Sequence, residues 1–176
     1  MLWKLDGLTE YDARRPLTPS GTNLLGLVKH LTGTEAGYLG DTFGRPLDDP
    51  LPWLTDDAEE NVDMWATPDE SREEIVGLYR HVWQHSDATI AAYGLDTHAV
   101  VEPWPPERRD VTLQQIIVHM IAETSRHAGH ADIVREQIDG AAGLRDGTTN
   151  MPEGDSAWWA SHHDRVERAA RTVDDR

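Results

Sequence analysis

The sequence predicts an all-α protein, most simply an antiparallel bundle. In several segments, apolar side chains recur at the three- and four-residue spacing of amphipathic helices. Proline, glycine and capping residues separate these segments. No segment alternates apolar and polar residues clearly enough to indicate a strand. We therefore expect a single helical domain over residues 1–176, which is long enough to bury its own core.

The N-terminal quarter should contain the end of one helix and the whole of a second. Residues 1–8 have the pattern of a last helical turn that stops at a glycine. Residues 9–19 should form a turn-rich connection, because two prolines interrupt any helix there. The second helix should begin at a cap on Ser20 or Thr22 and run to about Phe43.

Two long loops and three further helices complete the predicted chain. Residues 47–67 form a loop of a length that is more often functional than a plain connector. We expect a third helix from a cap at Thr67 to Tyr93, a proline-rich loop over 95–110, and a fourth helix that Asp110 or Thr112 caps and Gly140 ends. Asp155 then caps a last, amphipathic helix.

Composition narrows the classes of partner. The balance of 16 basic and 32 acidic residues gives a net charge of −16, which disfavours binding to a nucleic-acid backbone. No run of about 18 apolar residues indicates a membrane helix. The first ten residues lack the basic and apolar regions of a signal peptide. The absence of cysteine excludes disulfides and thiolate metal ligands and fits a cytoplasmic protein.

Four titratable side chains share one face of the fourth helix. His119, Glu123, His127 and His130 follow one another at spacings of four, four and three residues. On an ideal helix they fall within an arc of roughly 80°, at the border of the apolar face. Such groups are expensive to bury unless they are hydrogen-bonded, paired or bound to a metal. This stripe is therefore the candidate functional site of the chain.

Part of the stripe could hold a divalent cation. Glu123 and His127, four residues apart, can grip one ion, and His30 of the second helix could supply a third ligand. Three protein ligands with an open position are typical of catalytic sites. Two imidazoles and a carboxylate suit Zn²⁺, and Ni²⁺, Fe²⁺ or Mn²⁺ also fit. His119 and Glu123 form a rival pair, and such pairs also occur as solvated pairs on ordinary helices.

Three stretches resemble the DinB-like metal-dependent four-helix family, in particular its actinobacterial mycothiol-transferase branch. They are LLGLVKHLTGTEAGYLGDTFGRP at 24–46, LYRHVWQHSDATI at 78–90 and HMIAETSRHAGHADIVREQIDG at 119–140. The HxxxExxxHxGHxD pattern in the last stretch is the most specific. The resemblance covers nearly the whole chain and implies a four-helix bundle.

The resemblance also implies roles for the stripe. A divalent metal, often zinc, would be held by His30, Glu123 and His127. Many relatives have His where this chain has Glu123, and Glu there resembles the maleylpyruvate isomerase-like branch. His119 and His130 would orient the ligands, bind substrate or accept a proton, since imidazole titrates near neutral pH.

The implied reaction uses a low-molecular-weight thiol such as mycothiol. The metal-bound thiolate would attack an electrophilic small molecule, giving a conjugate or a thiol-assisted isomerisation. Because the chain has no cysteine, the sulfur must come from outside. The loops around Trp53, Trp65 and Trp104 could shape the pocket of the second substrate, although hydrophobic packing is the simpler explanation.

One departure from the family and several alternatives remain open. Relatives begin with a full first helix, whereas this match starts near its end, at LWKLDGL. Either the natural start lies upstream, or the first helix is truncated and homodimerisation or an extra C-terminal helix covers the core. The alternatives in function are a non-catalytic metal-stabilised bundle, a metal-free helical interaction module and a metal-dependent hydrolase.

Overall fold

The structure, a computed structural model, describes residues 1–55, 57–149 and 151–174. The chain divides into two units, residues 1–142 and 143–176, which we describe separately. The single domain expected over the whole chain stays a prediction. Among the described helices, none combines the length and apolar character that crossing a membrane requires.

The first unit is mostly helical, as predicted. Its three long helices are α2 (Leu24–Leu39), α3 (Arg72–Ala92) and α4 (Leu113–Asp139). Its short elements are the 3-10 helices η1 (Leu2–Leu5), η2 (Asp41–Phe43) and η3 (Val62–Met64), the helix α1 (Glu10–Arg14), and the strands β1 (His98–Val100) and β2 (Asp110–Thr112). The four-helix bundle stays a prediction, because the residues in which we expected the last turn of a first helix form only the short η1.

The expectation of no strand was wrong for one short ribbon. β1 and β2 pair antiparallel, with Ala99 opposite Val111. The backbone N–H of Val101 donates to the carbonyl of Arg109 at 2.8 Å and extends the pairing by one step. Val101 and Val111 are buried in the core at this end of the unit. With three residues in each strand, the ribbon is too short for an alternating pattern to stand out in the sequence.

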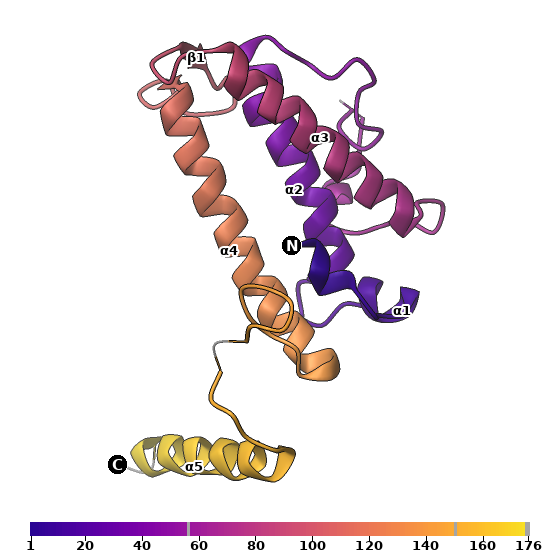
Figure 1. Cartoon of the computed structure of the whole chain (residues 1–176), viewed down its shortest axis with the longest axis vertical. Helices are drawn as coiled ribbons and strands as arrows, with labels where there is room; N and C mark the ends of the chain where they lie inside the picture. Colours follow the sequence, from indigo (N-terminus) through magenta and orange to yellow (C-terminus); the bar gives the residue numbers. More distant parts are fainter. Residues whose placement is uncertain (56, 150, 175–176) are drawn as a thin grey trace. The chain divides into compact units, whose positions relative to one another are not determined.

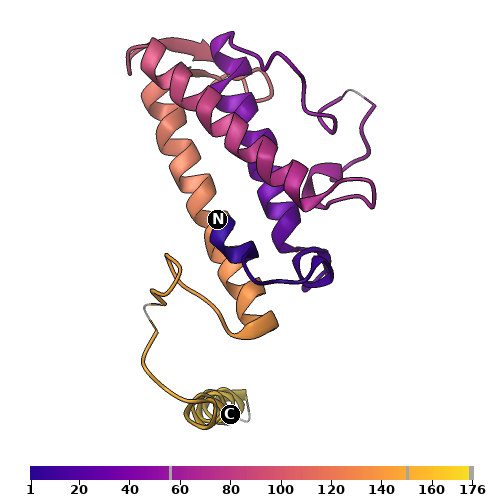
Figure 2. The same ribbon diagram turned by 45° about the vertical axis from the view of Figure 1, so that its right-hand side comes forward.

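The three long helices do not alternate in direction. α2 and α3 both end beside the β1–β2 ribbon, and α4 begins there (Figure 1). α2 packs against both α3 and α4. The predicted antiparallel arrangement therefore holds between α4 and the other two helices and is wrong for α2 and α3. The long connection 40–71 returns the chain to the other end of the unit before α3 starts (Figure 2).

The starts of α2 and α3 lie a few residues beyond the predicted caps. The side chain of Asn23, not Ser20 or Thr22, accepts the backbone N–H at the start of α2. Ser71, not Thr67, caps α3 with a reciprocal capping box. All of these residue types cap helices well, so the sequence alone could not choose among them.

The fourth helix and the last helix start where the sequence indicates. Thr112, one of the two predicted residues, caps α4 in a capping box, and Gly140 ends it in the left-handed conformation with φ of 78°. In the second unit, α5 spans Ser156–Asp174. The Asp155 carboxylate accepts the N–H of Trp158 at 2.8 Å, as a helix cap does.

The N-terminal segment is tied down by charged side chains. Lys4 of η1 forms an ion pair with Asp132 of α4. Arg135 donates to the Lys4 carbonyl at 2.7 Å. After η1, Thr9 caps the short helix α1, which lies within the segment predicted as a turn-rich connection. The prolines that suggested a connection end this helix and do not prevent it.

A buried lysine holds the long connection against α2. Lys29 is fully buried, and its ammonium donates to the carbonyls of Val62 at 2.8 Å and Trp65 at 3.0 Å. It also lies 2.8 Å and 2.9 Å from the two carboxylate oxygens of Glu70. A buried ammonium needs this full set of acceptors. We call these contacts the Lys29 clamp. They place η3 beside His30, the residue that follows Lys29 in α2.

Candidate metal centre

Two stripes of side chains face each other across α2 and α4. On each helix, residues four apart lie on one face, and the two helices run in opposite directions. The stripes are His30, Thr34 and Tyr38 on α2 and His127, Glu123 and His119 on α4. The two stripes meet at one end, where the rings of His30 and His127 are 4.8 Å apart.

The three predicted ligands converge at that end. One possible donor atom from each of His30, Glu123 and His127 lies within 4.8 Å of the others. Oε1 of Glu123 is 2.9 Å from Nε2 of His127 and 3.7 Å from Nε2 of His30. Side chains from two helices thus form the group that the sequence could only suggest, and their role as ligands stays a prediction.

A fourth residue, Asp63 of η3, supports His30. Its carboxylate oxygen Oδ2 lies 2.6 Å from Nδ1 of His30. Because a carboxylate accepts, Nδ1 donates, and the lone pair of a neutral ring is then on Nε2, the nitrogen on the side of Glu123. A carboxylate in this position commonly orients a metal-binding histidine. The sequence reading missed Asp63, which lies 33 residues from His30 in a long loop.

His127 meets Glu123 through Nε2, which lies 2.9 Å from the carboxylate and donates to it. A cation held between the two side chains would take the place of this proton. Nδ1 is buried without a hydrogen-bond partner in the described residues. Burial lowers the pKa of His127 and outweighs the opposing hydrogen bond to Glu123. The imidazole is therefore neutral near neutral pH, which is the form that binds metals.

Glu123 supplies the negative charge of the group. Burial acts to raise the pKa of this carboxyl, but the hydrogen bond from His127 and the positive charge of nearby Arg126 lower it overall. The group thus combines a carboxylate with two imidazoles, all with their donor atoms close together. This donor set fits a divalent cation such as Zn²⁺.

A cavity of about 490 Å³ adjoins the group. Its wall includes His30 and Glu123 at one end and Tyr38 and His119 at the other. Residues 100–103, which begin at the last residue of β1, also line the cavity. Small-molecule sites usually fall in the range of about 300–1,000 Å³, so the cavity can hold a ligand.

The remaining two histidines of the stripe lie in different surroundings. His119 lines the cavity, and its ring lies 4.7 Å from that of Tyr38 and 5.1 Å from that of Trp104. His130 is exposed, with its ring 5.3 Å from that of His127. The structure therefore brings His119 to the cavity and leaves His130 outside it, next to a predicted ligand.

The three tryptophan loops also have different environments. Trp53 is buried in a core cluster, which supports packing as its role. Trp65 is 40% exposed. Trp104 donates its indole N–H to the Tyr38 hydroxyl at 2.9 Å, beside the cavity. Of the three, only Trp104 is bonded to a residue of the cavity wall.

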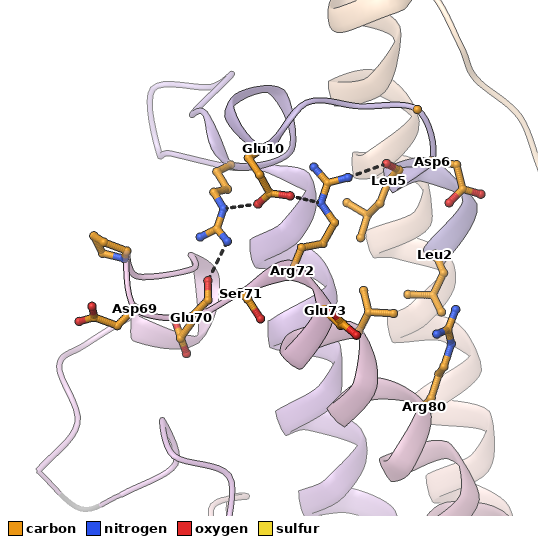
Figure 3. A pocket seen from close by; sticks show the side chains of 14 residues that line it. Leu2, Leu5, Asp6, Glu10, Asp69, Glu70, Ser71, Arg72, Glu73 and Arg80 are labelled. Carbon is orange, nitrogen blue, oxygen red and sulfur yellow. Dashed lines mark hydrogen bonds and ion pairs between the residues drawn. The ribbon is translucent and has the colours of Figure 1, made fainter.

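A larger cavity, of about 780 Å³, lies between η1, α1 and the start of α3 (Figure 3). The Glu10 carboxylate there bridges Arg14 at 2.9 Å and Arg72 at 2.8 Å. Arg72 also donates to backbone carbonyls, including that of Leu8 at 3.0 Å. Among the described residues, no group of metal-binding side chains converges in this cavity. The charged side chains in this cavity hold α1 against the start of α3.

Comparisons with known proteins agree with the family suggested by the sequence. A family model described as Mycothiol-S-transferase matches residues 1–140. The matched region contains both cavities and ends close to the boundary between the two units. A search of curated proteins finds no match.

Proposed function

Because the chain belongs to the mycothiol-S-transferase family, we propose that it transfers a low-molecular-weight thiol such as mycothiol to an electrophilic small molecule, using a divalent cation, most simply Zn²⁺. The observation that carries the metal dependence is the convergence of His30, Glu123 and His127 within 4.8 Å beside a cavity. The family relation also favours a DinB-like four-helix bundle as the parent fold.

The cation would be held by the carboxylate of Glu123 and the neutral rings of His30 and His127. When bound, it would stabilise the thiolate form of the incoming thiol near neutral pH. Asp63 accepts from Nδ1 of His30 and keeps the lone pair of that ring on Nε2. The position of Asp63 in turn depends on the Lys29 clamp, which fixes η3 by its Val62 carbonyl.

The two other histidines take separate roles in this proposal. His119 lines the cavity and accepts the proton that the thiol releases or returns a proton to the product. His130 is exposed and contacts the His127 ring, so it supports the orientation of that ring. Its distance from the cavity wall makes it a poorer candidate for proton transfer than His119.

The test is thiol-dependent loss of an electrophile such as monochlorobimane. We expect activity with thiol and Zn²⁺, loss of activity with a chelator, and loss in His127→Ala. His98→Ala is the matched control, because His98 is an exposed histidine of β1 outside the site. Rates unaffected by both metal removal and His127→Ala would contradict the proposal. Metal-dependent turnover without any thiol would indicate a hydrolase in its place.

A further inference from the structure

The far end of the cavity, away from the predicted ligands, contains a second polar group. Trp104 donates its indole N–H to the oxygen of Tyr38 at 2.9 Å. An indole N–H can only donate, so the hydroxyl is the acceptor and keeps its own proton. Among the described residues, nothing accepts that proton. The half-buried Tyr38 lines the cavity, so its hydroxyl can donate to a ligand there.

Aromatic contacts restrict the Tyr38 ring. It meets the His119 ring at 4.7 Å and the Trp104 ring at 5.7 Å, both edge to face. These contacts, together with the Trp104 hydrogen bond, hold the hydroxyl in place. A donor fixed before the ligand arrives loses little freedom on binding, which is how polar groups in small-molecule sites give specificity.

The spacing along the helices separates this donor from the predicted ligands. Tyr38 follows His30 by eight residues on α2, which corresponds to about 12 Å of helix rise. His119 precedes Glu123 by four residues on α4, or about 6 Å. A small electrophile can therefore lie between the two ends of the cavity, with one end near the thiol and the other near Tyr38.

We propose that Tyr38 is a specificity-determining hydrogen-bond donor to an oxygen of the second substrate that gains negative charge during thiol addition, as the carbonyl oxygen of an α,β-unsaturated ketone does. This inference rests on the proposed function, because it assigns the second substrate of the same site. Trp104 is a positioning residue, since it acts through the Tyr38 oxygen.

Thiol addition to an α,β-unsaturated carbonyl compound makes use of such a donor. A bond forms between the thiolate sulfur and the β-carbon, and the electron pair of the C=C bond moves toward the carbonyl oxygen. The resulting enolate oxygen accepts the hydrogen bond from Tyr38. The α-carbon then takes up a proton that balances the one released by the thiol. In displacement of an alkyl chloride, by contrast, the electron pair leaves with chloride, and no oxygen gains charge.

The first test compares these two reactions in Tyr38→Phe, which keeps the aromatic ring and removes the hydroxyl. With 2-cyclohexen-1-one, we expect kcat/KM to fall roughly 100- to 1,000-fold, as when a donor to a developing oxyanion is removed. With benzyl chloride, we expect a change below about twofold, because that reaction makes no use of the donor. Tyr11→Phe is the control, since Tyr11 is 72% exposed and lies outside the cavity. Equal losses with both substrates would overturn the proposal in favour of a packing role.

The second test measures binding without turnover in the metal-free protein. Acetophenone and ethylbenzene differ chiefly by a carbonyl oxygen, and neither undergoes thiol addition at a C=C bond. We expect Tyr38→Phe to weaken acetophenone binding about three- to tenfold, the range of one neutral hydrogen bond, and to leave ethylbenzene binding unchanged. Unchanged acetophenone binding would overturn the proposal. If the wild type lacked thiol-dependent turnover, the proposed function would fail, whereas a selective loss of acetophenone binding would still support the donor.

Discussion

The two cavities of the first unit differ in volume and in the state of their polar groups. The larger, of about 780 Å³, contains a carboxylate shared by two arginines, and both arginines are also bonded to backbone carbonyls. The smaller, of about 490 Å³, is lined by His30 and Glu123 of the convergent group and by Tyr38. Among the described residues, the hydroxyl proton of Tyr38 has no acceptor, which leaves unused bonding capacity at this cavity. Unused capacity, more than volume, distinguishes a binding site from a structural junction here.

Lys29 connects the surroundings of the two cavities. Its partner Glu70 lines the larger cavity, and the loop that Lys29 holds contains Asp63, which contacts His30 at the smaller cavity. We expect Lys29→Ala to lower the free energy of unfolding by about 3–5 kcal/mol, since it leaves buried acceptors and a partly buried carboxylate without their cation. Urea denaturation measures this effect. Arg80→Ala, on an exposed residue at the larger cavity, is the control. A loss below about 1 kcal/mol would show that the clamp matters little.

Metal binding beside the smaller cavity should stabilise the fold, and substitutions at the larger cavity should not alter this effect. At a free Zn²⁺ concentration of 100 times Kd, we expect the free energy of unfolding to rise by about 2.7 kcal/mol. The same increment should appear in Arg72→Ala, and it should vanish in His127→Ala and on chelation. Thermal or urea unfolding with and without Zn²⁺ measures it. Loss of the increment in Arg72→Ala would mean that the two regions are not independent.

Asp63 should tune metal affinity, although it is not a predicted ligand. We expect Asp63→Ala to weaken Zn²⁺ binding about 10- to 100-fold, because Nδ1 of His30 loses its acceptor. Asp63→Asn should have a smaller effect, since its carbonyl can still accept. Competition with a chromophoric chelator measures both affinities. Asp69→Ala, at the larger cavity, is the matched control. Equal affinity in wild type and Asp63→Ala would remove Asp63 from the site.

Arg72 should matter for stability and not for metal binding. We expect Arg72→Ala to lower the free energy of unfolding by about 1–2 kcal/mol, through the lost ion pair with Glu10 and the lost hydrogen bonds to backbone carbonyls, with a discount because Glu10 is exposed. Arg80→Ala should change it by less than about 0.5 kcal/mol. The Kd for Zn²⁺ should be unchanged in both variants. A weakened Kd in Arg72→Ala would contradict the division between the two cavities.

Local sequence patterns predicted much of the fold. Helical spacing and end signals located the long helices, and Gly140 ends α4 as expected. The exact caps could not be predicted, because Asn23 and Ser71 compete with nearby residues of equal capping ability. The parallel course of α2 and α3 is a tertiary property, since a long connection can return the chain to either end of a bundle.

The candidate site was half predictable for the same reason. Spacing of four residues on one helix indicates two possible pairs, His119 with Glu123 and Glu123 with His127, and it is the family resemblance that favours the second pair together with His30. Asp63 and the role of Tyr38 could not be predicted, because both depend on contacts between segments far apart in the chain. Tyr38 reads in the sequence as one more apolar-face residue of a helix.

Zinc stoichiometry tests the central claim most directly. Wild type and the four variants His30→Ala, Glu123→Ala, His127→Ala and His98→Ala are dialysed against Zn²⁺, and bound metal is measured by mass spectrometry alongside a folding check by circular dichroism. We predict one ion per chain in wild type and His98→Ala, and loss of the bound ion in each of the other three while their helical content is retained. Full stoichiometry in folded Glu123→Ala, His30→Ala or His127→Ala would contradict the assignment of that residue as a ligand, and full stoichiometry in all three would refute the site.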